Sequence, residues 1–129
     1  MIHSSYKQEE NILYIDRKDE IKMQDLFALV QDTVSNYKEI KCLYIIDDAR
    51  DSIPQFSSHD YPELSKRVSD ALAHFLEVRH AILVDTPMNT ALGILFEGMA
   101  SEIPSYSFKT FFSEEDAKKW LREGDHFCG

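Results

Sequence analysis

Two short apolar runs, each ending in an aspartate, constrain the fold of this chain most strongly. They are CLYIID at residues 42–47 and HAILVD at residues 80–85. A strand that is apolar along its whole length is buried on both faces, which is typical of the parallel sheets of α/β proteins. The two runs therefore predict strands of a central, mostly parallel sheet with helices packed against it.

Three amphipathic patterns alternate with these strands and predict helices. Their apolar faces consist of Met23, Leu26, Phe27, Val30 and Val34; of Leu64, Val68, Ala71, Leu72 and Phe75; and of Met88, Ala91, Leu92, Leu95, Phe96 and Met99. We expect Asp60 and Thr86 to cap the second and third helices, at 61–77 and 87–102, because a proline follows each cap in the first turn. Residues 48–60 are predicted to form a polar loop.

The two ends of the chain complete the predicted fold. Residues 2–20 contain two strand-like runs around a polar turn at 9–11, which predicts a β-hairpin. Residues 108–112 predict a last strand, and Ser113 a helix N-cap. The short helix that follows places Ala117, Trp120 and Leu121 on one face, so we expect Trp120 to clamp it to the sheet. The sequence thus predicts a single domain, 1–129, with a mixed sheet of about five strands and four helices.

Composition narrows the range of partners and compartments. The 129 residues carry a formal net charge of −9, which disfavours binding to nucleic acids and to anionic membranes. No apolar run approaches the roughly 20 residues that a membrane span needs, and the N-terminus does not resemble a signal peptide. Cys42 and Cys128 form no metal-binding or redox motif, and Cys42 is expected to pack as a small apolar side chain. A cytoplasmic location is the resulting expectation.

Three segments carry a family resemblance: CLYIIDDAR, RHAILVD and KTFFSEEDAKKWL. Together with the order of the elements, they resemble the SpoIIAA-like branch of the STAS superfamily, which is often described alongside the lipid-binding SEC14 domains. The resemblance implies a small binding or regulatory module without catalysis and without a cofactor. In sporulation-type members a partner kinase phosphorylates a serine after the central strand. The corresponding stretch, 47–60, contains Ser52, Ser57 and Ser58 but lacks the Asp-Ser-Ser-Gly pattern of that switch.

A cluster of acidic residues is the strongest candidate for chemistry. It consists of Asp47, Asp48 and Asp51, together with Asp85 and Thr86. Ligands of open α/β sheets bind at the carboxyl ends of the strands, so these carboxylates, with Lys109 on the next strand, offer a divalent-cation site or phosphoacceptor pocket. The simpler interpretation is that Asp47 begins a loop and that Asp85 and Thr86 cap a helix.

No catalytic residue is predicted from the remaining motifs. His59, His74 and His80 are expected at the surface, and no nucleophile elbow or glycine-rich phosphate loop is present. The chain is therefore predicted not to be an enzyme.

Three functional hypotheses follow from these patterns. The first is an interaction module that binds an unidentified protein partner through the 48–60 loop and the outer rim of the helices at 61–77 and 87–102. Its candidate contact residues are Asp47, Asp48, Arg50, Asp51, Ser57, Ser58, Asp85 and Thr86. The second is a carrier of a small apolar or lipid-like ligand, favoured by the Met- and Phe-rich helix at 87–102. The third is the metal-dependent phosphoacceptor. A homodimer is also expected as a possible assembly, since symmetric pairs are the commonest oligomers.

Overall fold

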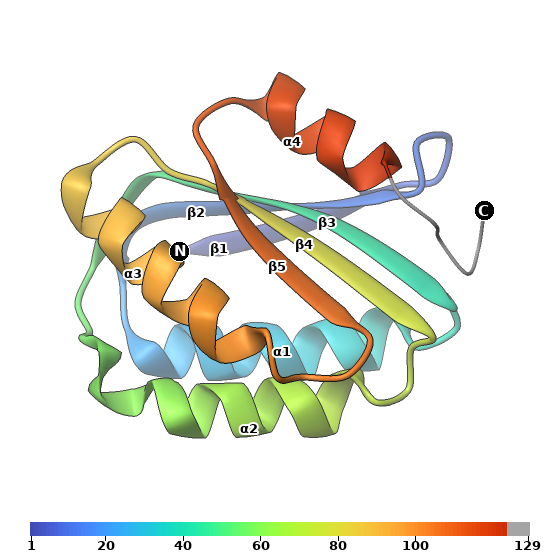
Figure 1. Cartoon of the computed structure of the whole chain (residues 1–129), viewed down its shortest axis with the longest axis horizontal. Helices are drawn as coiled ribbons and strands as arrows, with labels where there is room; N and C mark the ends of the chain where they lie inside the picture. The colour runs from blue at the N-terminus through green and yellow to red at the C-terminus, as the bar shows by residue number, and fades with distance from the viewer. Residues whose placement is uncertain (124–129) are drawn as a thin grey trace.

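A single five-stranded sheet organises the computed structural model, which describes residues 1–123 (Figure 1). The strands lie side by side in sequence order; β1 is antiparallel to β2, and the other neighbours are parallel. The predicted mixed sheet, hairpin and four helices are confirmed. The elements are β1 (Ile2–Lys7), β2 (Ile12–Ile21), α1 (Met23–Tyr37), β3 (Cys42–Pro54), the 3₁₀ turn η1 (Ser58–Asp60), α2 (Tyr61–Leu72), β4 (Glu77–Leu83), α3 (Pro87–Ala100), β5 (Tyr106–Phe111) and α4 (Glu114–Arg122).

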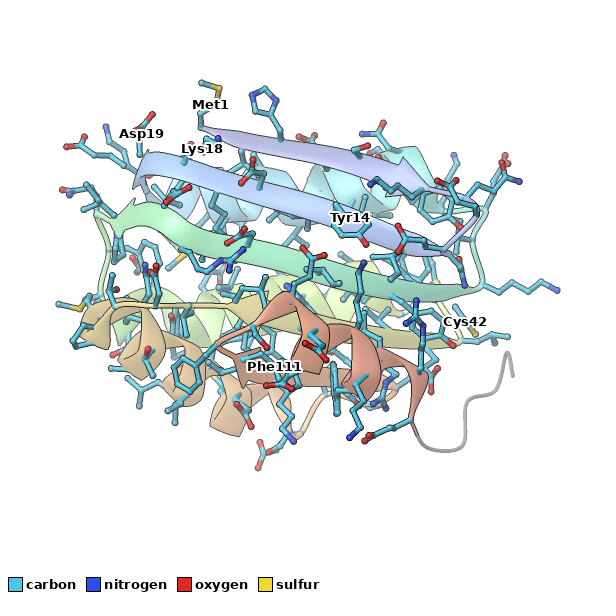
Figure 2. All side chains as sticks on the ribbon, turned by 90° about the horizontal axis from the view of Figure 1, so that it is seen from above. Met1, Tyr14, Lys18, Asp19, Cys42 and Phe111 are labelled. Atoms are coloured by element: carbon cyan, nitrogen blue, oxygen red, sulfur yellow. The ribbon has the colours of Figure 1, made fainter. Side chains whose placement is uncertain are left out.

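The helices form two unequal layers. Helices α1, α2 and α3 cover one face of the sheet, here called the inner face, and α4 lies on the opposite, outer face (Figure 1). Strands β2 to β5 are added in one direction, and crossovers between parallel strands are right-handed, so their three helices fall on the same face. Figure 2 shows that α4 leaves much of the outer face of β1 and β2 uncovered.

The core is correspondingly divided in two. The larger part lies between the inner face and α1–α3 and includes Leu13, Leu43 and Val78, which are almost fully buried. The smaller part lies beneath α4 and consists of Ile12, Ile46, Ala81, Leu83, Ala117 and Leu121, with Tyr14, Tyr44, Phe111 and Trp120 at its edge. Trp120 is half-buried, and the Arg79 guanidinium lies 4.1 Å from its ring centre. The predicted clamp between the last helix and the sheet is confirmed.

Helix-start signals in the sequence are confirmed in two of three cases. The Thr86 hydroxyl accepts a hydrogen bond from the Asn89 backbone N–H, and the Ser113 hydroxyl accepts one from Asp116. Asp60 precedes α2 as predicted but makes no side-chain capping bond. Helix α2 also ends earlier than predicted, so His74 follows the helix instead of lying on it.

The two central strands are placed differently from the prediction. Strand β3 continues through Asp47 to Pro54, because residues 48–54 keep pairing with β2 up to the pair Ile21–Pro54. Most of the predicted polar loop is therefore strand, and Asp47 lies in the middle of β3. Strand β4 begins at Glu77, so His80 is an interior residue, while Asp85 lies beyond the end of the strand.

The rotation of α3 also differs from the prediction. Met88 and Leu95, which were assigned to its buried face, are 60% and 54% exposed. The helix is apolar around much of its circumference, so periodicity alone did not define its buried side. Gly93 faces the sheet instead, since a Cβ there would lie 3.0 Å from the Thr110 hydroxyl oxygen.

Two further sequence expectations concern membranes and cysteine. None of the helices formed by residues 1–123 is long and apolar enough to cross a bilayer. Cys42 is buried at the start of β3, as expected, but it is disulfide-bonded, so the expectation that it packs as a free apolar side chain is wrong. Cys128 lies outside the described residues.

Candidate functional site

Four polar side chains cross the buried inner face of the sheet in a diagonal line, here called the polar row. They are Arg17 on β2, Asp47 on β3, His80 on β4 and Tyr106 on β5. Asp47 pairs with Ile15 on one side and with Ile82 on the other, so Arg17 and His80 are its diagonal neighbours, two residues along each flanking strand. Long side chains in this relation can touch, because the strands are pleated and alternate residues share a face.

Hydrogen bonds connect the whole polar row. Arg17 donates through Nε to Asp47 Oδ1 at 2.9 Å and through Nη2 to Oδ2 at 2.6 Å, a two-point ion pair. His80 Nε2 lies 2.9 Å from the same Oδ2, and His80 Nδ1 lies 2.8 Å from the Tyr106 hydroxyl oxygen. One continuous network therefore spans four strands.

The charge of Asp47 is maintained inside the protein by its neighbours. Its side chain has no exposed surface. Burial by itself would raise the pKa of this carboxyl, but the Arg17 guanidinium and the hydrogen bond from His80 outweigh burial and lower the pKa of Asp47 to about 2. Asp47 is thus a carboxylate at any physiological pH.

Tyr106 ends the polar row as a protonated phenol. Its burial, reinforced by the negative charge of Asp47, raises the pKa of the Tyr106 hydroxyl well above its usual range. The distances are satisfied by a neutral imidazole whose Nε2–H donates to Asp47, while the Tyr106 O–H donates to His80 Nδ1.

A β-bulge accompanies Arg17. Asp16 pairs with Asp48, whereas Lys18 pairs with Asp51, so two β3 residues, Ala49 and Arg50, lie opposite Arg17. Bulges of this kind bend a strand and redirect side chains. Arg17 lies at this irregularity and faces the helices of the inner layer instead of solvent.

An apolar cavity of about 80 Å³ adjoins the polar row, between the inner face of the sheet and helices α1–α3. Its walls include Leu26 and Val30 of α1, Leu64 and Val68 of α2, and Leu92 and Phe96 of α3. Arg17, His80 and Tyr106 line the same cavity, whereas Asp47 lies behind them. The cavity therefore has mostly apolar walls, with hydrogen-bonding groups of the polar row on its sheet side.

Asn89 adds an amide to the lining of the cavity. Its Nδ2 donates to the backbone oxygens of Ala49 at 3.2 Å and Ser52 at 3.0 Å, which attaches the start of α3 to β3. Its Oδ1 has no hydrogen-bond partner among residues 1–123. Since Ala49 also lies opposite Arg17, the amide and the guanidinium belong to the same end of the cavity.

The acidic residues predicted to share a cation are separated by the sheet. Asp47 faces the inner layer, whereas Asp48 forms an ion pair with Arg50 at 2.9 Å, and Asp51 and Asp85 are exposed. The proposed contribution of Lys109 is also not realised, because its side chain is exposed on β5. No group of three metal-binding side chains is gathered anywhere in the part of the chain that the structure describes.

At the surface, Arg50 interacts with Asp48 and Asp85, two of the acidic residues predicted as site residues. Asp48 accepts hydrogen bonds from its backbone and its guanidinium, and Asp85 adds a nearby negative charge. These carboxylates raise the pKa of Arg50. Thr86 acts as the cap of α3, so the simpler interpretation of Thr86 is confirmed.

The serines of the 47–60 stretch occupy three different environments. Ser52 is buried in β3 and its hydroxyl donates to the Ala49 oxygen, so a kinase cannot reach it in the folded protein. Ser57 is exposed and caps η1 by accepting from the His59 N–H. Ser58 is exposed within η1. Only the last two remain accessible to modification.

Sequence reasoning did not find three members of the polar row. His80 was expected at the surface but is part-buried, and Arg17 was placed within the predicted hairpin without any role. Tyr106 preceded the predicted last strand. The sequence did contain one signal, because every second residue of a strand points to the same face. Leu13, Ile15 and Arg17 are such alternate residues of β2, and the first two are buried.

Comparison with known proteins agrees with the fold. No protein-family model and no curated protein matches the sequence. Among solved structures, an uncharacterized protein of the DUF3478 family from Shewanella loihica PV-4, described as having a SpoIIAA-like fold, is similar with a TM-score of 0.60. The match covers 94% of this chain and 92% of that chain at 15% identity. The present chain has a SpoIIAA-like fold. The resemblance to SpoIIAA-like proteins noted in the sequence is thus confirmed at the level of fold.

Proposed function

We propose that this protein is a non-catalytic binding module that holds a small, largely apolar molecule in the cavity beneath its sheet. The observation that supports this is the composition of the cavity, with apolar walls from three helices and a few polar groups in its lining. Small-molecule sites in proteins usually have this composition. A volume of about 80 Å³ accommodates roughly five to eight water-sized groups, which corresponds to a short-chain compound and not to a whole lipid.

The proposal that the module is non-catalytic rests on the state of Tyr106. An aspartate, a histidine and a hydroxyl in sequence resemble the groups that activate a nucleophile. Here the hydroxyl is a buried phenol whose pKa is raised well above its usual range, so His80 does not convert it to a phenolate. The polar row is better suited to holding a ligand than to attacking one.

Binding to the cavity is tested by methyl NMR with 1-hexanol as the probe. Val30 is half-buried and lines the cavity, so Val30→Trp is expected to fill part of it and to weaken hexanol binding at least tenfold. Ala28→Trp, on the exposed side of the same helix, is the matched control and should leave binding unchanged. Shifts that spread over exposed methyl groups, or that persist in Val30→Trp, would contradict the proposal. Native mass spectrometry of the freshly purified protein then identifies any retained ligand.

A second candidate is the interaction or regulatory module inferred from the family resemblance. It is favoured by large apolar side chains on the surface: Met88, Ile94 and Leu95 of α3 are each more than half exposed, as are Ile53 and Phe112. Exposed apolar residues of this size are common at protein-binding surfaces. The surface that was predicted from sequence, at Asp48, Arg50 and Asp51, lies on β3 instead of a loop.

The interaction hypothesis is tested by affinity capture with quantitative mass spectrometry. Leu95→Glu should abolish capture of a specific partner if α3 is the binding surface. Arg50 is part-exposed on β3. Charge reversal at Arg50 should abolish capture if the partner instead binds the surface predicted from sequence. Capture that neither substitution affects would exclude both surfaces.

A further inference from the structure

Arg17 brings free donors to the lining of the cavity. It uses Nε and one Nη2 hydrogen for Asp47, and its Nη1 has no hydrogen-bond partner among residues 1–123. The remaining guanidinium hydrogens can therefore donate to a ligand or to water. A carboxylate suits these donors, because its two oxygens only accept and pair well with a planar guanidinium.

The charge of the polar row limits which anion can enter the cavity. Arg17 and Asp47 neutralise each other, so with His80 in the neutral form that satisfies its two hydrogen bonds the polar row carries no net charge. A carboxylate would therefore bring an uncompensated negative charge into an apolar environment, close to the carboxylate of Asp47. Such burial is strongly unfavourable unless a positive charge enters with it.

His80 is the group placed to accept that positive charge as a proton. With both ring nitrogens protonated, Nε2–H still donates to Asp47, and Nδ1–H donates to the Tyr106 oxygen instead of accepting from it. The Tyr106 O–H is then released to donate elsewhere, and Tyr106 lines the cavity. Protonation of one residue thus creates both a compensating charge and a second donor.

We infer that the cavity takes up a small monocarboxylic acid as its carboxylate together with one proton, with the carboxylate at Arg17 and the proton on His80. This inference rests on the proposed function and specifies its ligand class. A dianion such as a phosphate monoester would need a second proton, and the polar row contains only one group suited to receive it.

The other elements packed around His80 contribute no competing charge. Strand β2 supplies Arg17, β3 supplies Asp47 and β5 supplies Tyr106. From the helices, the polar residues that line the cavity are Tyr61 of α2, Thr33 of α1 and Asn89 of α3. Burial raises the pKa of Tyr61 to about 12, so this phenol stays neutral, and Thr33 and Asn89 do not titrate. Proton uptake on binding is therefore assigned to His80.

Isothermal titration calorimetry with hexanoate and 1-hexanol tests the inference on the wild-type protein. Hexanoate should bind at least tenfold more tightly than hexanol near pH 6, and its affinity should fall by up to about tenfold per pH unit as the pH rises. Hexanol affinity should not change with pH. Titrations at one pH in two buffers of different ionisation enthalpy should show uptake of about one proton with hexanoate and none with hexanol.

The outcomes separate this inference from the proposed function. Hexanol binding as tightly as hexanoate at every pH, or hexanoate binding without proton uptake, would overturn the inference while the cavity remained a binding site. Failure of both compounds to bind would overturn the proposed function itself. The double variant Arg17→Gln/Asp47→Asn removes both charges together and should lose the preference for hexanoate, so that its affinities for hexanoate and hexanol lie within about threefold of each other. If this variant does not fold, the titrations of the wild-type protein with hexanoate and hexanol still test the inference.

Discussion

At the scale of single residues, Asp47 shows how a charge is retained inside an apolar sheet. It has no exposed surface, yet Arg17 and His80 provide three hydrogen bonds to its two oxygens. Removing one partner of such a buried pair is far more costly than removing both, because an uncompensated charge then remains. The neighbouring Asp48, whose ion pair with Arg50 is about one-third exposed, provides a natural comparison.

Substituting Asp47→Asn should lower the free energy of unfolding by about 3–5 kcal/mol, since Arg17 would remain buried without its carboxylate. Asp48→Asn should cost less than about 1 kcal/mol, as exposed ion pairs usually do. Urea denaturation of both variants measures the difference. Equal losses in the two variants would show that the buried ion pair contributes no more to the free energy of unfolding than the exposed one.

Asp47 also predicts a specific acid sensitivity. Its pKa of about 2 lies below the value of 3.8 for an unperturbed aspartate, so the native state binds this proton more weakly than the unfolded chain does. The resulting stabilisation, about 2 kcal/mol, is fully present above pH 4 and is lost as the pH falls toward 2. The difference in unfolding free energy between wild type and Asp47→Asn should therefore shrink by about this amount over that range. A difference that stays constant with pH would contradict the assignment.

At the scale of elements, α4 is a short helix held in place by one buried face. Ala117 and Leu121 are almost fully buried, and Trp120 packs against Phe111 and beneath Arg79. Lys118 adds an ion pair with Glu10 of the β1–β2 turn, at 3.3 Å. A helix of this length is not stable alone, so its docking depends on these contacts.

Leu121→Ala should lower the free energy of unfolding by about 2–4 kcal/mol, because it removes a buried side chain beneath α4. The change is measured by urea denaturation, and the emission of Trp120, the sole tryptophan, should shift to longer wavelength as the helix loosens. Lys119→Ala, exposed on the same helix, is the control and should change stability by less than about 0.5 kcal/mol. An unaltered emission spectrum in Leu121→Ala would show that α4 is held by other contacts.

Two glycines in α3 offer an internal comparison of helix propensity and packing. Gly98→Ala should stabilise the protein by about 0.5–1 kcal/mol, since a Cβ there meets no atom within 4 Å. Gly93→Ala should lack this gain, because its Cβ would lie 3.0 Å from the Thr110 hydroxyl oxygen. Thermal denaturation of both variants provides the measurement. Equal stabilisation would mean that Thr110 moves aside without cost.

At the scale of the whole molecule, repulsion among the many negative charges lowers the stability of the folded state. The net charge of −9 is spread over 129 residues, and self-repulsion of this kind destabilises a compact state. The lack of nucleic-acid binding, the cytoplasmic location and the formation of a homodimer stay predictions. Light scattering on the purified protein tests for the homodimer.

Raising the ionic strength from about 20 to 200 mM should increase the melting temperature by a few degrees, because salt screens this repulsion. Differential scanning calorimetry measures the shift. The double variant Asp32→Lys/Glu102→Lys, which reverses two exposed charges, should show a smaller response to salt. A larger response would indicate that salt acts through specific ion binding instead.

The sequence by itself determined the order and type of the elements, because those depend on local patterns. Continuous apolar runs predicted the central strands, and hydroxyl caps at Thr86 and Ser113 predicted two helix starts that the structure confirms. The SpoIIAA-like fold was expected from the resemblance of three segments to that family, and the structural comparison confirms it.

Only the tertiary structure decided the length of β3, the rotation of α3 and the composition of the polar row. Strand β3 extends past Asp47 because β2 continues beside it, and α3 turns Gly93 inward because β5 approaches closely there. Arg17, Asp47, His80 and Tyr106 come from four strands and meet only through diagonal register. No local pattern contains that register, because it arises when strands distant in sequence align across the sheet.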